Sequence, residues 1–425
     1  MTEGFSLDKE FAEAQKWKLT DEDIERAKVL IGLYIADNKD QFVTEASANQ
    51  IRNYAFGTGD DNPLYCDPAY GRRTRWGTQI APPSMAEVVQ RAMRGDPLSK
   101  EIRAQTKGLF RGVHEYFSGS EKFYYQPIYP GDALYCYTGD DDMVVKPSEY
   151  AGRSLTRFNT RMKINQHGAP VFKQTNRRIY AERSSAVKKG KYMKIEPTVY
   201  TDEMLEKIDA IYARETARGA EPRWWEDVAA GEAMPAMVKG PLLTTHVFTY
   251  HAGGYGIMDF GLFGSRLWHK NRKRIPPFYI KNEQGIPDVA QRVHWDSKWA
   301  NAIGNPMAYD YSVIREAWLN HYLTDWVGDD GWVWRQYDEM RKFNYVGDTQ
   351  FLSGSVTGKR VEDGRYYVDL QLEMKNQRDE VTTRGEATVL LPSRDGGPVI
   401  LPPPPFDVAR TAARMFVRHN QLAGA

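Results

Sequence analysis

The sequence repeats itself at a separation of a little over 210 residues. The segment YPGDALYCYTG at 129–139 is echoed 216 residues later by YVGDTQFLSGS at 345–355. The segment that begins MKINQ at Met162 is echoed 212 residues later by the segment that begins MKNQR at Met374. A repeat of this length has the size of a domain rather than that of a solenoid unit. The 425-residue chain is therefore expected to fold as two related domains that form a pseudo-dimer.

Each half combines helical and strand-like patterns. In the first half, residues 21–36 carry an apolar stripe at helical spacing, and a second helix is predicted to begin at the cap residue Ser84 and to stop at Gly95. Segments rich in aromatic and β-branched residues follow between 112 and 184 and predict a meander of strands. The long helix of the second half is predicted from Ser312. A helix laid on such a meander indicates an α+β architecture in each half.

The repeat also predicts where the domains begin and end. A polar and basic stretch near residue 186, followed by an amphipathic helix, separates the halves, and a run of prolines marks the start of a tail. The predicted parts are an N-terminal helical extension (1–40), a first domain (41–187), a linker with a helix (188–224), a second domain (225–395) and a Pro-rich C-terminal tail (396–425).

Composition excludes several classes of partner and compartment. The 57 basic and 56 acidic residues leave a net charge of +1, so no overall field would attract nucleic acid or an anionic membrane. Cys66 and Cys136 are the only cysteines, which excludes a disulfide framework and a thiolate zinc site and fits a reducing compartment. No run of 18 apolar residues occurs, and the acidic N-terminus lacks the pattern of a signal peptide. A cytoplasmic protein is therefore predicted.

One acidic segment, YAFGTGDDNPLYCDP at 54–68, points to chemistry. Taken alone, its Asp, Asn and Pro residues are also typical of a tight turn. The segment resembles the overhang motif Gly-Asp-x-Asn-Pro-(Leu/Ile)-His of the MaoC-like acyl dehydratases, also called (R)-specific enoyl-CoA hydratases. Within this resemblance, the N-terminal half of the chain is similar to a FAS1-like dehydratase. The resemblance covers 43–185 and 225–393 and implies a double hot-dog fold. The residues that match the motif are Gly59, Asp60, Asn62, Pro63 and Leu64.

The resemblance implies two candidate catalytic sites. The first uses Asp60 and Asn62, but Tyr65 stands where the family has its catalytic histidine, and a phenol is a poor base at neutral pH. The second uses His294, which matches the histidine of the motif, with Asp288 six residues before it. The two sites are expected on opposite sides of the pseudo-twofold axis, so Asp60 and His294 are not expected to form one dyad. The second site is favoured slightly because it supplies an imidazole.

His246 and His251 are not expected to bind a metal, and no metal site is predicted. The remaining histidines are assigned structural roles, namely His114, His167, His269, His321 and His419. The resemblance further implies that the helix N-termini near Ser84 and Ser312 stabilise a thioester enolate. Arginines are expected to meet the phosphates of coenzyme A, namely Arg72, Arg75 and Arg292.

The function implied by the resemblance is that of a hydro-lyase on acyl thioesters, an enzyme that reversibly hydrates an enoyl-CoA to a 3-hydroxyacyl-CoA. No metal or redox cofactor is expected, because coenzyme A enters as part of the substrate. The expected partner is therefore an acyl-CoA, and a homo-oligomer is compatible with the sequence. Two alternatives stay open: an acyl-CoA thioesterase on the same fold, and a non-catalytic acyl-CoA-binding subunit of a dehydratase complex.

Overall fold

The computed structural model describes residues 19–110, 113–148, 152–181, 195–256, 265–303 and 305–424. Its main feature is one ten-stranded antiparallel sheet in the order β1-β3-β4-β5-β2-β9-β12-β11-β10-β6. The order is symmetric about the β2–β9 seam, so each strand of the first half has a counterpart in the second. The first pair of echoed segments leads into β3 and β10, and the second pair begins within β4 and β11. In both pairs the two strands are counterparts in the sheet. The predicted duplication and α+β double hot-dog fold are confirmed.

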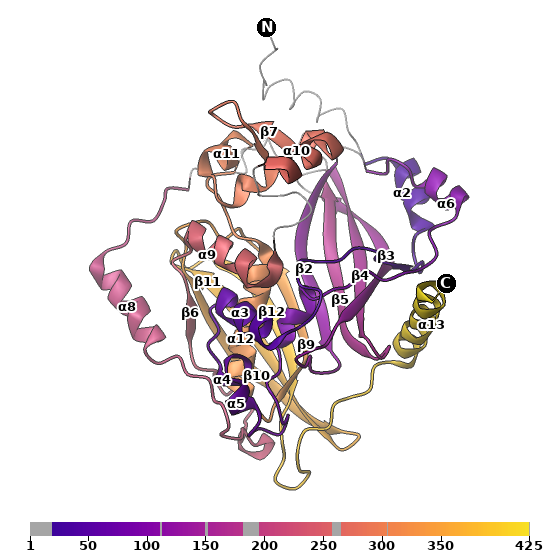
Figure 1. Cartoon of the computed structure of the whole chain (residues 1–425). Helices are drawn as coiled ribbons and strands as arrows, with labels where there is room; N and C mark the ends of the chain where they lie inside the picture. Colours follow the sequence, from indigo (N-terminus) through magenta and orange to yellow (C-terminus); the bar gives the residue numbers. More distant parts are fainter. Residues whose placement is uncertain are drawn as a thin grey trace.

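Each half consists of short helices followed by long strands (Figure 1). The first half contains α2 (Asp21–Lys28), β1 (Ile35–Ala36), α3 (Ala48–Thr58), α4 (Pro63–Cys66), α5 (Pro68–Gly71), a 3₁₀ helix (Pro83–Glu87), α6 (Lys100–Gln105), β2 (His114–Tyr124), β3 (Leu134–Ser148), β4 (Gly152–Asn165) and β5 (Pro170–Ala181). The second half contains β6 (Met237–Lys239), α9 (Thr244–Tyr250), a π-helical turn (His251–Tyr255), α10 (Ser265–Arg274), β7 (Tyr279–Lys281), β8 (Pro287–Val289), a 3₁₀ helix (Ala290–His294), α11 (Ser297–Ala302), α12 (Ser312–Val327), β9 (Trp332–Met340), β10 (Gln350–Glu362), β11 (Arg365–Asn376) and β12 (Val381–Leu390).

Helix α12 is the central helix of the second half, and strands β9–β12 surround it (Figure 1). Nearly all of its side chains are buried, including Trp318, Leu319, Tyr322 and Leu323. These residues belong to a core cluster that also contains residues of the first half. Burying each large apolar side chain contributes about 1.5–3 kcal/mol. The predicted helix from Ser312 is therefore confirmed, and it packs against both halves.

Two helix predictions in the first half are wrong. The helix predicted over 21–36 ends at Lys28, and Ile35–Ala36 pair with β3 instead. The helix predicted from Ser84 to Gly95 is only a 3₁₀ turn, Pro83–Glu87. Bridges of Val89 to Val43 and of Arg91 to Tyr135 hold the following residues in an extended conformation. These long-range backbone pairs outweigh the local helical spacing.

Helix α3 was not predicted, although its local signals are clear. Ser47 caps it by accepting a hydrogen bond from the N–H of Gln50, and its buried stripe includes Ile51, Tyr54 and Ala55. Since α3 directly precedes the acidic motif, it positions the first candidate site.

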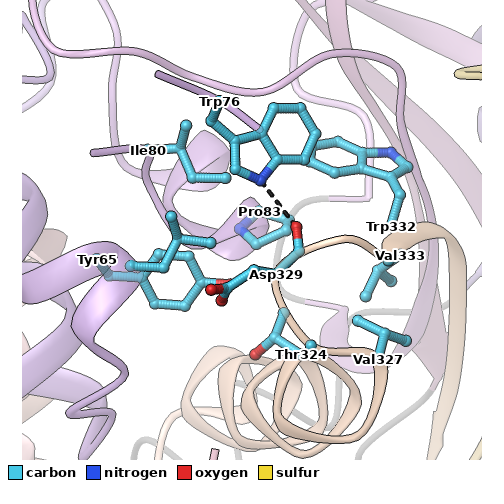
Figure 2. A pocket seen from close by; sticks show the side chains of 12 residues that line it. Tyr65, Trp76, Ile80, Pro83, Thr324, Val327, Asp329, Trp332 and Val333 are labelled. Carbon is cyan, nitrogen blue, oxygen red and sulfur yellow. Dashed lines mark hydrogen bonds between the residues drawn. The ribbon is translucent and has the colours of Figure 1, made fainter. Parts of the chain in front are cut away.

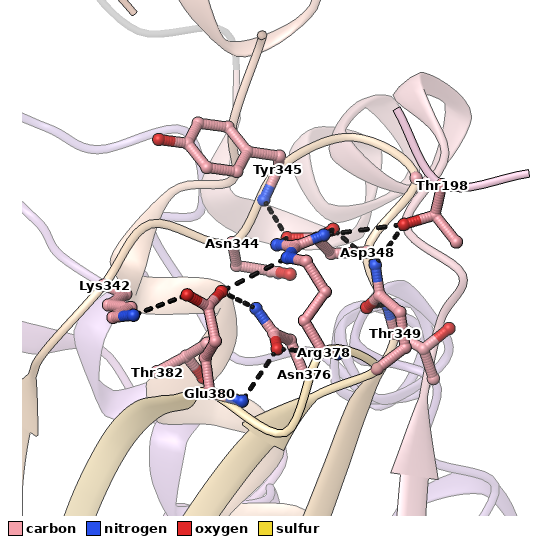
Figure 3. A network of polar contacts seen from close by, with 12 residues as sticks. Thr198, Lys342, Asn344, Tyr345, Asp348, Thr349, Asn376, Arg378, Glu380 and Thr382 are labelled. Atoms are coloured by element: carbon pink, nitrogen blue, oxygen red, sulfur yellow. Dashed lines mark hydrogen bonds and ion pairs between the residues drawn. The ribbon is translucent and has the colours of Figure 1, made fainter. Parts of the chain in front are cut away.

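The linker forms a helix, as predicted, over α8 (Asp202–Tyr212). Thr198 of the linker is fastened to the second half by a polar network (Figure 3). Arg378 donates two hydrogen bonds to the carboxylate of Asp348, at 2.7 and 2.8 Å. Gln377 donates to Thr198 and to the same carboxylate, both at 2.7 Å. The chain therefore reaches α8 from a fixed point on the second half.

The Pro-rich tail leads into α13 (Phe406–Ala423), which lies beside the strands of the first half (Figure 1). Among the described residues, every helix is too short or too polar to cross a bilayer.

Candidate active site

The motif around Asp60 is held by its own local hydrogen bonds. Helix α3 ends at Gly59, which adopts the left-handed conformation (φ 75°), and the N–H of Asp60 bonds back to the carbonyl oxygen of Ala55. The N–H of Asn62 donates to Oδ1 of Asp60 at 2.9 Å, and Asn62 Oδ1 caps α4 by accepting from the N–H of Leu64. Asn62 thus positions the Asp60 carboxylate, which is 2% exposed.

The carboxylate of Asp60 faces α12 of the other half. His321 Nε2 lies 3.6 Å from Asp60 Oδ1 and 3.2 Å from Asp325 Oδ2. His321 and Asp325 are four residues apart, so they share one face of the helix. All three side chains are buried. The structure therefore builds an acid–imidazole cluster from both halves of the chain.

Lys239 fixes the tautomer of this imidazole. Its Nζ lies 2.9 Å from His321 Nδ1, 3.1 Å from Glu215 Oε1 and 3.4 Å from the carbonyl oxygen of Gly59. An ammonium only donates, so Nδ1 accepts and the neutral imidazole carries its proton on Nε2. That N–H points toward the two carboxylates.

Burial shifts the protonation equilibria of the cluster. Burial raises the pKa of Asp60, an effect that His321 opposes and the nearby Asp325 reinforces. Burial likewise raises the pKa of Asp325 to about 7, and it lowers the pKa of His321. Since two carboxylates that face one imidazole repel each other, the pair retains a proton near neutral pH.

Tyr65 lines a small cavity beside this cluster (Figure 2). Burial raises the pKa of Tyr65 well above 10, and its side chain hydrogen-bonds Thr324. The hydroxyl is therefore a donor at neutral pH. Across the cavity, Trp76 Nε1 donates to the carbonyl oxygen of Asp329 at 2.9 Å. The cavity volume of about 20 Å³ has room for one water molecule.

The second predicted site is not assembled. His294 Nδ1 lies 2.8 Å from the carbonyl oxygen of Tyr309, its ring packs 3.8 Å from that of Tyr311, and burial lowers its pKa to about 4. Asp288 lies in β8, where its carboxylate accepts from the N–H of Val289. Within the described part of the chain, no hydrogen bond or ion pair joins Asp288 to His294. The predicted pairing fails because the two side chains are held by different neighbours.

Three of the residues predicted to contact the acyl-CoA, at its thioester or its phosphates, are already engaged. The N–H of Ser84 donates to Oδ1 of Asn320 at 3.1 Å, so it is not an open donor. The guanidinium of Arg75 donates to two backbone carbonyls, and that of Arg292 is buried and does the same. Arg72 is exposed, and its guanidinium makes no hydrogen bond or ion pair in the described part of the chain.

Sequence reasoning missed His321, to which it gave a structural role, and it also missed Asp325 and Lys239. The His-x-x-x-Asp spacing within the helix predicted from Ser312 was the available signal, because it places both side chains on one face. No local pattern marks Lys239.

The ligand atoms of Asp60, His321 and Asp325 lie within 4.8 Å of one another, which is close enough for a divalent cation. To coordinate a cation, Nε2 of His321 would need a free lone pair. Because Lys239 donates to Nδ1, the ring proton lies on Nε2, and that lone pair is not free. The cluster therefore fits proton transfer better than metal binding.

Comparison with known proteins agrees with this architecture. Residues 34–174 match the family model described as FAS1-like, dehydratase domain region. A solved structure described as a MaoC-like dehydratase superposes with a TM-score of 0.56 at 15% identity, over 85% of this chain and 99% of that one. A putative MaoC domain protein dehydratase from Chloroflexus aurantiacus gives 0.52 at 11% identity, over 86% and 96%.

A curated relative, the UPF0336 protein of Thermobifida fusca, is 30% identical over 100 residues. That match spans 23% of this chain and 62% of the relative's length. The fold defines a double hot-dog protein. The first half of the chain contains a FAS1-like dehydratase region, and the chain as a whole shares its fold with solved MaoC-like dehydratases.

Proposed function

We propose that this protein is a hydro-lyase on acyl thioesters, which reversibly hydrates an enoyl-CoA to a 3-hydroxyacyl-CoA. One observation carries the proposal: Asp60 of the dehydratase motif faces His321 and Asp325 of the other half. The family resemblance implies an Asp and a His that together hold the reacting water. Here Tyr65 replaces the motif histidine, and His321 supplies an imidazole from α12.

The cluster offers both a base and an acid. In hydration, the ionised carboxylate of Asp60 takes a proton from water as the oxygen bonds to the β-carbon, and the electron pair of the double bond moves toward the α-carbon. Protonated Asp325 then gives its proton to the α-carbon. A group with a pKa of about 7 is well matched to this donation at neutral pH. The N–H of His321 lies between the two carboxylates, and Tyr65 contributes a hydroxyl donor.

The proposal is tested with Asp60→Asn and His321→Gln, assayed by loss of the ultraviolet absorbance of crotonyl-CoA. Removing a positioned general base typically costs ~10²–10⁴-fold in rate, so Asp60→Asn should lose hydration on that scale. His321→Gln removes the imidazole N–H that faces both carboxylates and should also lose most of the activity. His294→Gln is the matched control, since it changes a buried histidine of the other candidate site, and it should retain most of the activity.

Activity that survives in both variants, or is lost only in His294→Gln, contradicts the assignment. Free thiol released from saturated acyl-CoA would identify a thioesterase instead. Binding of enoyl-CoA without turnover by the unmodified protein would identify a binding subunit.

A further inference from the structure

A second cavity, here called the linker cavity, lies where the linker meets the second domain. Its volume is about 410 Å³, within the usual range of ~300–1,000 Å³ for sites that take small ligands. Three arginines contribute to its wall in a chain whose overall charge is nearly zero. The lining residues are Arg218, Glu221, Pro222, Arg223, Trp224, Asp227 and Arg394.

Arg218 has unused capacity to bind an anion. In the described part of the chain, its guanidinium makes no hydrogen bond, and its ion pair with Glu221 is long, at 3.7 Å. The Glu221 side chain is 82% exposed, so this pair is weak. Arg223 lines the same cavity; its Nε donates to the carbonyl oxygen of Trp326 and its Nη1 to Glu232, both at 2.9 Å, so that among the described contacts Nη2 is its unused donor. Two such guanidiniums favour a phosphate between them.

The opposite wall of the linker cavity offers an aromatic face. Trp224 is half-buried, and the guanidinium of Arg394 lies 5.4 Å from its ring. Arg394 is held by two hydrogen bonds to Asp227, at 2.6 and 2.5 Å. Because this guanidinium lies over one face of the indole, a purine base would stack on the other face.

Arg218, which lines the linker cavity, contacts the C-terminal end of α12, whose residues line the Tyr65 cavity. The N–H of Arg218 donates to the carbonyl oxygen of Asp325 at 3.2 Å. Gly328, which lines the Tyr65 cavity, has φ 72°, and a Cβ there would lie 3.1 Å from Cγ and Cδ of Arg218. The backbone of Arg218 is therefore bonded to the helix that carries His321 and Asp325, at a point where glycine avoids both strain and a close contact.

We propose that the linker cavity binds the 3′-phospho-ADP portion of the acyl-CoA substrate, with a phosphate at Arg218 and Arg223 and the adenine at Trp224. This inference rests on the proposed function, because it assigns the nucleotide of the same thioester. It assigns the phosphate to Arg218 and Arg223, which line one cavity, in place of Arg75 and Arg292, which do not line it.

Binding is measured by calorimetry on the full chain with 3′,5′-ADP as the probe. The unmodified protein should bind it, and Arg218→Gln should weaken binding roughly tenfold, the usual effect of one charge-assisted hydrogen bond. Glu221→Gln should tighten binding, because it removes the carboxylate that competes for Arg218.

Arg214→Gln is the matched control: Arg214 is exposed on the same segment, and its replacement should leave binding unchanged. Arg218→Lys, with an unchanged melting temperature, controls for misfolding and should bind with intermediate affinity.

Kinetics separates this inference from the proposed function. Arg218→Gln should raise KM for crotonyl-CoA roughly tenfold and leave kcat/KM for crotonyl-N-acetylcysteamine unchanged, since that thioester lacks the nucleotide. Equal effects on both thioesters, or no binding of 3′,5′-ADP, would overturn the inference and leave the hydratase proposal standing. If 3′,5′-ADP binds in a manner that depends on Arg218 but the protein has no hydratase activity, the hydratase proposal is overturned and the nucleotide site stands. Binding of inorganic phosphate as tight as that of 3′,5′-ADP would show a simple anion site and overturn the nucleotide assignment.

Discussion

Asp325 is the residue whose protonation links the stability of this protein to pH. Burial raises its pKa to about 7, whereas an aspartate in an unfolded chain titrates near ~3.9. Between these values the folded protein holds a proton that the unfolded chain releases. Unfolding therefore releases a proton in this window, and stability falls as pH rises through it, by about 1.4 kcal/mol per pH unit.

Asp325→Asn should remove this dependence. From pH 5 to pH 7, the free energy of unfolding of the variant should rise relative to that of the unmodified protein by about 2–3 kcal/mol. Urea unfolding at the two pH values measures the difference, and Asp209→Asn, a change of an exposed aspartate on α8, is the control. If the difference in free energy of unfolding between the variant and the unmodified protein is the same at both pH values, Asp325 is ionised throughout this range.

At the scale of elements, the seam between β2 and β9 contains a buried charge network. Lys122 of β2 is fully buried, and its Nζ lies 2.7 Å from Oε1 of Glu87 and 2.9 Å from Oε2 of Glu316 on α12. Ser120 donates to the same Glu316 carboxylate at 2.6 Å. The lysine thus holds together two acids from different halves, which would otherwise repel each other.

Lys122→Met should lower the free energy of unfolding by about 3–5 kcal/mol, because it leaves two buried carboxylates without their counter-charge. Adding Glu87→Gln and Glu316→Gln should restore part of the loss. Lys207→Met breaks an exposed pair with Glu203 and should change stability by less than ~0.5 kcal/mol. A loss for Lys122→Met as small as that of the control would show that the seam does not depend on this charge. Denaturant unfolding measures all three variants.

At the scale of the whole molecule, the duplication places both halves of one site in a single chain. Asp60 comes from the first half and His321 from the second, and the two meet within one molecule. A homodimer of single hot-dog domains would share such residues between chains, whereas this pseudo-dimer does not need a partner to complete the cluster.

Mixing inactive variants tests this arrangement. Co-expressed Asp60→Asn and His321→Gln chains should remain inactive, because every molecule then lacks one member of the cluster. The Asp60→Asn/His321→Gln double variant, expressed with unmodified protein, is the control and should leave the activity of the unmodified chains intact. Recovery of about a quarter or more of the unmodified rate in the first mixture would show that sites form between chains.

The sequence alone determined the features that depend on local or repeated patterns. The repeat near 215 residues predicts two related α+β domains, and the sheet order about the β2–β9 seam has the matching symmetry. The loop that carries Asp60 could be recognised because Asn62 and Gly59 fix it through bonds to residues within a few positions. Such local hydrogen bonds follow directly from residue types and their spacing.

Only the tertiary structure decided which distant side chains meet. His321 is 261 residues from Asp60 and Lys239 is 82 residues from His321, and their contacts depend on how α12 packs against α3 and β6. The helix predicted from Ser84 also gave way to bridges with Val43 and Tyr135. These outcomes depend on burial and pairing energies summed over many long-range contacts, which no local window of the sequence contains.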